Sequence, residues 1–131
     1  SKLRAAAVAR CAPVVVSIRS GTRHLYLSAL PESSPDNEDW ARRKANVCLR
    51  CHASSLRVGL ILANEGRAPW PDGVLETKDY AAHGGGFPVR VEGTGVVAAI
   101  GVSGLPSRED HDLIVTVLAS HLGVADLPPT P

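Results

Sequence analysis

Apolar and polar residues alternate in two parts of the chain, and this period-two pattern predicts two β-hairpins. Residues 14–19 place three β-branched side chains on one face of an extended strand and polar side chains on the other. A Ser-Gly-Thr turn leads from there to a partner strand over residues 24–28. The second hairpin joins residues 87–91 to residues 96–103 through a Glu-Gly-Thr-Gly turn, and we expect it at the centre of the sheet.

Apolar residues spaced three and four apart predict helices in the rest of the chain. Residues 2–10 fit the end of a helix, and Ser34 followed by a proline and acidic residues fits the start of a second helix. A third helix is expected over residues 56–64, and a fourth after Ser107 that ends at Gly123. In the second helix, Trp40, Val47, Cys48 and Cys51 are expected to share a buried face.

Two antiparallel hairpins with helices between and after them indicate an α+β domain in which helices cover the sheet. A chain of 131 residues fits one domain, assigned here to residues 1–125, and the proline-rich residues 126–131 are expected to be a disordered tail. The polar segment from Arg67 to Asp79, which carries Trp70, is long enough to suggest a functional loop. Because the sequence has no methionine, Ser1 is not expected to be a natural start.

Composition narrows the classes of partner. A net charge of +1, with two Trp, two Tyr and one Phe, disfavours nucleic-acid binding. No apolar run approaches the ~18 residues of a membrane span, so we expect no membrane partner. Three cysteines are few, and an odd number cannot all pair within a secreted disulfide scaffold. The cysteine content therefore favours a reducing, cytoplasmic setting.

The pattern Cys48-Leu49-Arg50-Cys51-His52 matches the C-x-x-C-H sequence that attaches haem covalently in secreted cytochromes. Here it falls late in a helix, without an export signal or a methionine for the opposite side of the iron. A zinc site would need further ligands that the sequence does not supply. The simpler interpretation is that both cysteines pack as small apolar residues, and we predict no metal site.

His83-Gly84-Gly85-Gly86-Phe87 contains the most distinctive glycine run. Successive glycines can expose backbone N–H groups to an anion, but nucleotide-binding loops lead into a helix and this run leads into a strand. Two interpretations therefore remain open. The glycines either permit close backbone packing or form a ligand or interface site in which His83 is the polar anchor.

Ser54, Ser55 and Arg57 open a predicted helix, where they fit either simple capping or a carboxylate or phosphate site. Arg42-Arg43-Lys44 is interpreted as a solvated face that can contact an anionic ligand. Asp110-His111 is interpreted as an acid in the first turn of a helix beside an exposed histidine. No known catalytic motif is present, so we predict no catalytic residue and favour a protein that is not an enzyme.

Several of these segments together resemble a small branch of the haem-degrading domain (GlcG/HbpS-like) superfamily. The resemblance spans Pro13 to about Gly123. It is carried by Ser-Pro-Asp-Asn at residues 34–37, Trp40, Arg43-Lys44, Ser54-Ser55, Tyr-Ala-Ala-His-Gly-Gly-Gly-Phe-Pro at residues 80–88, Gly-Thr-Gly-Val at residues 93–96, Val-Ser-Gly-Leu-Pro at residues 102–106 and Asp110-His111.

This resemblance implies a profilin-like α-β-α sandwich and symmetric homo-oligomers. Some relatives bind haem or promote its breakdown, others act in cofactor or glycolate metabolism, and one eukaryotic relative is linked to the delivery of tail-anchored proteins. The chain departs from the family in its Cys-Leu-Arg-Cys-His segment and in lacking the expected N-terminal helix.

The leading hypothesis is a cytoplasmic, oligomeric domain that binds a small anionic molecule, with non-covalent haem as one such ligand. His83 or His52 would ligate iron, and arginine would pair with the propionates. The expected ligand-binding residues are His83, Gly84, Gly85, Gly86, Phe87, Ser54, Ser55, Arg57 and Arg43. A structural or adaptor protein acting through its oligomeric surface is the alternative, and a hydrolase or lyase built on Asp110-His111 with His83 is the third hypothesis.

Overall fold

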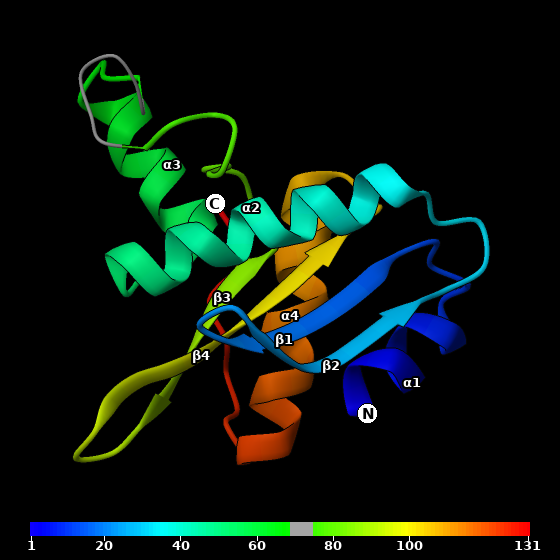
Figure 1. The fold of residues 1–131 in the computed structure, drawn as a ribbon. Coiled ribbons are helices and arrows are strands. Elements are labelled where there is room, and N and C mark those ends of the chain that lie inside the picture. The colour runs from blue at the N-terminus through cyan, green and yellow to red at the C-terminus, as the bar shows by residue number, and fades with distance from the viewer. Residues whose placement is uncertain (69–74) are drawn as a thin grey trace.

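The computed structural model describes residues 1–68 and 75–131, so the predicted role of Trp70 lies outside the described residues. This part of the chain forms four helices and one four-stranded antiparallel sheet (Figure 1). The elements in chain order are α1 (Lys2–Ala9), β1 (Val15–Ser20), β2 (Arg23–Ala29), α2 (Pro35–Cys51), α3 (Ser55–Asn64), β3 (Gly86–Val91), β4 (Gly95–Ser103) and α4 (Ser107–Leu122).

The strand order β2-β1-β4-β3 places the two predicted hairpins side by side. Strands β1 and β4 pair at the centre, with Val16 opposite Val102, so each hairpin contributes one inner and one outer strand. The expectation that the second hairpin is central is therefore right for β4 and wrong for β3, which is an edge strand. Pro88 fits this position because a proline cannot donate to a second neighbouring strand.

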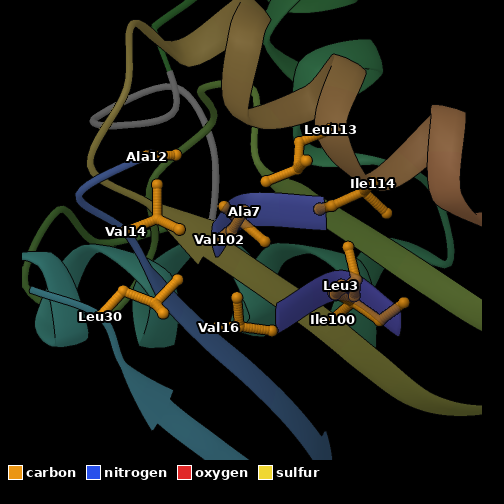
Figure 2. Packing of buried hydrophobic residues seen from close by; sticks show 10 residues of the cluster. All are labelled: Leu3, Ala7, Ala12, Val14, Val16, Leu30, Ile100, Val102, Leu113 and Ile114. Atoms are coloured by element: carbon orange, nitrogen blue, oxygen red, sulfur yellow. The ribbon is translucent and has the colours of Figure 1, made fainter. Parts of the chain in front are cut away.

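Helices cover both faces of the sheet, which confirms the α-β-α sandwich. Helix α2 crosses one face over β1, β4 and β3, while α1 and α4 pack on the other face (Figure 1). Side chains from α1, α4, the inner strands and the segments that adjoin β1 and β2 form the larger core (Figure 2). Its members are Leu3, Ala7, Ala12, Val14, Val16, Leu30, Ile100, Val102, Leu113 and Ile114. On the α2 face, Ala45, Cys48 and Ala99 form a smaller cluster.

The helix boundaries follow the predicted signals. The Ser34 backbone N–H donates to Asn37 Oδ1 (2.8 Å) at the start of α2, and Gly123 ends α4 in the left-handed conformation (φ 70°). The predicted buried face of α2 is right for Val47 and Cys48, but Trp40 is only half-buried and Cys51 is exposed. No helix among the described residues has the length and apolar character that a membrane crossing requires.

Candidate functional site

The glycine segment is buried and packs closely against its neighbours. A Cβ atom at Gly86 would lie 2.6 Å from the Lys44 carbonyl oxygen and 2.9 Å from Cys48 Sγ. Gly85 has a φ of +125°, and a Cβ there would lie 2.7 Å from Lys44 Nζ. Both observations support the packing interpretation of the glycines, since β3 can approach α2 only where these side chains are missing.

Ser55 joins the start of α3 to this segment. Its hydroxyl accepts the N–H of Gly86 (2.8 Å) and donates to the His83 carbonyl oxygen (2.5 Å), and the side chain is buried. Ser54 caps the helix instead, because its Oγ accepts the N–H of Arg57 (3.1 Å). The two serines therefore have different structural roles, and the capping interpretation holds for Ser54.

A cavity of about 900 Å³ opens between the end of α2, α3, β3 and the first turn of α4. This volume is typical of small-molecule sites, which span roughly 300–1,000 Å³. Its lining combines apolar side chains with several arginines and two histidines. The lining residues are Cys51, His52, Ala53, Ser54, Arg57, Val58, Ile61, Leu62, Arg67, Leu75, Phe87, Pro88, Arg90 and His111. Three of the predicted ligand-binding residues, Ser54, Arg57 and Phe87, therefore meet here.

His111 is the chemically distinctive residue of this cavity. Its Nδ1 atom is buried and has no hydrogen-bond partner among the described residues, and its ring centroid lies 6.0 Å from that of Phe87. Burial lowers the pKa of His111, against a smaller opposing effect of Asp112. The imidazole is therefore neutral at pH 7, which is the form that binds a metal.

We expect His111 to make the stability of the protein fall on acidification. Its pKa is lower in the folded than in the unfolded chain, so stability present above about pH 6.5 is lost as the pH falls through the folded value. Between about pH 7.5 and about pH 5.5, urea denaturation should show a steeper loss for the wild type than for His111→Gln. Parallel losses in the two proteins would contradict this assignment.

His83 and Arg43 lie away from the large cavity. The His83 ring meets Trp40 edge-on, with centroids 5.8 Å apart, and the Arg43 guanidinium lies 3.9 Å from the Trp40 centroid. His83 and Trp40 line two smaller hollows, one of about 340 Å³ shared with Arg43 and one of about 320 Å³ shared with Lys44. The structure therefore divides the predicted site residues between two places.

Lys44 and Asp110 form a buried ion pair at the base of the second of these hollows. Lys44 Nζ donates to Asp110 Oδ2 (3.0 Å) and to the Val102 carbonyl oxygen (3.1 Å), and Asp110 Oδ1 accepts the N–H of Leu105 (3.0 Å). The two side chains are 4% and 1% exposed. Burial lowers the pKa of Lys44 and raises that of Asp110. The prediction that Lys44 lies on a solvated face is therefore wrong, whereas Asp110 does lie in the first turn of α4 as predicted.

One signal in the sequence, its helical spacing, predicts that Lys44 lies on the buried face of α2. It stands four residues after Trp40 and four before Cys48, so it occupies the same stripe of α2 as these two residues. The charge of Lys44, which directly follows Arg42 and Arg43, instead suggested a solvated position. Arg67 and Arg90 were missed, and His111 was named only in the hydrolase or lyase hypothesis, because nothing local in the sequence brings these three segments together.

The cysteine motif is divided between the interior and the large cavity, because Cys48 is buried whereas Cys51 and His52 line the cavity. All three cysteines are free thiols, and burial raises the pKa of Cys48 to about 12. His52, which follows the motif, ends α2 with a φ of 54°, and its carbonyl oxygen accepts a hydrogen bond from Arg90. Within residues 1–68 and 75–131, no group of three or more His, Cys, Asp or Glu side chains is placed to hold a metal ion.

Comparison with known proteins identifies relatives over nearly the whole chain. A family model described as "Haem degrading protein HbpS-like" matches residues 1–119. A UPF0303 protein of Azotobacter vinelandii is 47% identical over 122 residues, which cover 93% of this chain and 74% of the relative. UPF0303 protein mlr5144 of Mesorhizobium japonicum is 45% identical over 124 residues, covering 95% of this chain and 74% of the relative.

Solved structures share the fold. The crystal structure of Ybr137w protein superposes with a TM-score of 0.84 at 26% identity, over 93% of this chain and 72% of that one. The crystal structure of a double mutant of HbpS from Streptomyces reticuli superposes with a TM-score of 0.71 at 26% identity, over 91% of this chain and 80% of that one. The crystal structure of a PduOC:Heme complex superposes with a TM-score of 0.74 at 22% identity, over 91% of this chain and 88% of that one. At this identity the likeness shows a shared fold only.

Proposed function

Because the chain belongs to the haem degrading protein HbpS-like family, we propose that it binds haem non-covalently in the 900 Å³ cavity, with His111 as the iron ligand. The observation that carries this proposal is that the His111 imidazole lines the cavity beside Phe87, with the two ring centroids 6.0 Å apart. A neutral imidazole that borders an apolar surface is a good ligand for haem iron.

The remainder of the cavity suits the rest of a haem molecule. Apolar side chains from α3, together with Phe87 and Pro88, offer a surface for the flat macrocycle. Arg57, Arg67 and Arg90 supply positive charge for the propionates, since guanidinium groups pair well with carboxylates. Bound haem would supply an iron centre whose reactivity depends on its axial ligand and surroundings. Ser54, Arg57, Phe87 and His52 line this cavity, and His111 takes the role of iron ligand that the sequence suggested for His83 or His52.

Haem titration followed at the Soret band tests the proposal. Wild-type protein should bind haem saturably, and His111→Ala should weaken binding by roughly tenfold or more, because an iron ligand is lost. His83→Ala is the matched control, since His83 lines other hollows. Undiminished binding by His111→Ala, or loss of binding only in His83→Ala, would contradict the assignment of the ligand.

We also propose that the protein is cytoplasmic and self-associates. Cys11 and Cys51 are exposed free thiols, which suit a reducing compartment. Leu25 and Leu27 on edge strand β2 are 54% and 43% exposed, a feature of surfaces that are covered in an assembly.

The exposed leucines of β2 also favour the second candidate function, a structural or adaptor protein without a ligand. Light scattering together with the haem titration separates the two functions, because an adaptor would associate but leave haem unbound.

A further inference from the structure

Three arginines line the large cavity, and they differ in the groups that they already bind within the protein. Arg67 Nε donates to Glu65 Oε2 (2.7 Å), so a carboxylate two residues away balances its charge. Arg90 donates to the His52 carbonyl oxygen, which joins β3 to the end of α2. Two of the three guanidinium groups therefore have partners before any ligand binds.

Arg57 is the third arginine, and its guanidinium is placed to pair with a ligand. It is an exposed residue that lines the cavity from α3, the helix that projects away from the sheet (Figure 1). Its backbone N–H donates to Ser54 Oγ, but its guanidinium makes no hydrogen bond or ion pair with any described residue. Within the described part of the chain, no aspartate or glutamate lines the cavity, so a bound carboxylate would meet positive charge there.

The apolar surface beside Arg57 fits a flat macrocycle. Ile61 stands one helical turn after Arg57, so both lie on the same side of α3, and Ile61 is 42% exposed. Phe87 and Pro88 line the same cavity from β3. A planar ligand that covers these side chains removes apolar surface from water whether or not it holds a metal. Of the interactions proposed for haem, only that of His111 needs iron.

We infer that Arg57 makes the cavity selective for porphyrins that carry free carboxylates, with or without iron. This inference rests on the proposed haem site and widens its ligand class. Burial of the macrocycle and pairing of a propionate with Arg57 both contribute to affinity when iron is absent. Arg57 then determines specificity among porphyrins, while His111 adds affinity for those that hold iron.

Metal-free protoporphyrin and its dimethyl ester test the role of Arg57, because the ester has the same macrocycle without the carboxylate charges. The fluorescence anisotropy of each porphyrin reports its binding. Arg57→Gln should weaken protoporphyrin binding by roughly three- to tenfold and leave ester binding unchanged, whereas Arg57→Lys should retain most of the affinity. Arg67→Gln is the matched control, and it should change binding by less than about twofold because Arg67 is paired with Glu65.

Three results would overturn the inference. The first is equal weakening of acid and ester binding by Arg57→Gln, which would indicate an effect of shape and not of charge. The second is an effect of Arg67→Gln as large as that of Arg57→Gln. The third is wild-type protein that does not bind protoporphyrin, whether or not it binds haem.

His111→Ala separates this inference from the proposed iron ligand. It should weaken haem binding and leave protoporphyrin binding unchanged, because the metal-free ring offers no iron to the imidazole. Undiminished haem binding by His111→Ala, with the selectivity of Arg57 intact, would contradict the iron ligand and support the role of Arg57. Haem binding that depends on His111, without any distinction between protoporphyrin and its ester, would support the iron ligand and overturn the role of Arg57.

Discussion

Lys44→Met is expected to lower the free energy of unfolding by about 3–5 kcal/mol, which would make it one of the most damaging single substitutions in the protein. The variant leaves the Asp110 carboxylate 1% exposed and without its counterion. It also leaves the Val102 carbonyl oxygen without the lysine that bonds it. Urea denaturation followed by circular dichroism measures the loss, which should appear as a lower midpoint with an unchanged slope.

The double variant Lys44→Met/Asp110→Asn should recover most of this loss. Burial raises the pKa of Asp110 and lowers that of Lys44, so ionising the two groups inside the protein carries a desolvation cost that their attraction only partly offsets. Arg42→Ala is the control, because the Arg42 pairs with Asp39 and Asp79 are partly exposed and worth at most about 1 kcal/mol. Equal losses for Lys44→Met and Arg42→Ala would show that the buried pair is unimportant.

Gly85→Ala is expected to cost roughly 2–5 kcal/mol, the sum of two effects. A left-handed backbone conformation is unfavourable for a residue with a Cβ atom by about 1–2 kcal/mol. Overpacking adds about 1–3 kcal/mol, because the new methyl group meets Lys44 Nζ at 2.7 Å and the Val102 carbonyl oxygen. The free energy of unfolding from urea denaturation is again the measurement.

Gly93→Ala separates these two effects. Gly93 also has a positive φ, +79°, but a Cβ atom there would meet nothing within 4 Å. This control should therefore lose only the conformational contribution, about 1–2 kcal/mol. If Gly85→Ala cost no more than Gly93→Ala, close packing would not be the reason for glycine in this segment.

The fold could be predicted largely because its signals are local. Alternating β-branched residues define both hairpins, and Ser34 and Gly123 mark helix ends that the structure confirms. The order of the strands was harder, since it depends on which strand of each hairpin pairs with the other hairpin. Val16 pairs with Val102 across 86 residues of sequence, and no local pattern specifies that contact.

The candidate site was less predictable because it is made of distant segments. Ser54, Arg57 and Phe87 were expected to share a ligand, and they do line one cavity. His111 was interpreted as an exposed residue, and the alternation of Asp110 and His111 between two spaces appears only once α4 is placed against the sheet. Two other predicted residues, His83 and Arg43, border a smaller hollow and stay predictions for another ligand. Ser55 bonds the backbone of the glycine segment instead of lining the cavity.

The most direct test of the haem proposal is to locate bound ferric haem by nuclear magnetic resonance. Ferric iron is paramagnetic and broadens the signals of nearby amides, so the broadened amides mark where the haem lies. We predict broadening at Arg57, Phe87 and His111, with the signals of strand β2 unaffected. Broadening centred on Trp40 and His83, or uniform broadening without a centre, would contradict the proposal that haem occupies the cavity beside His111.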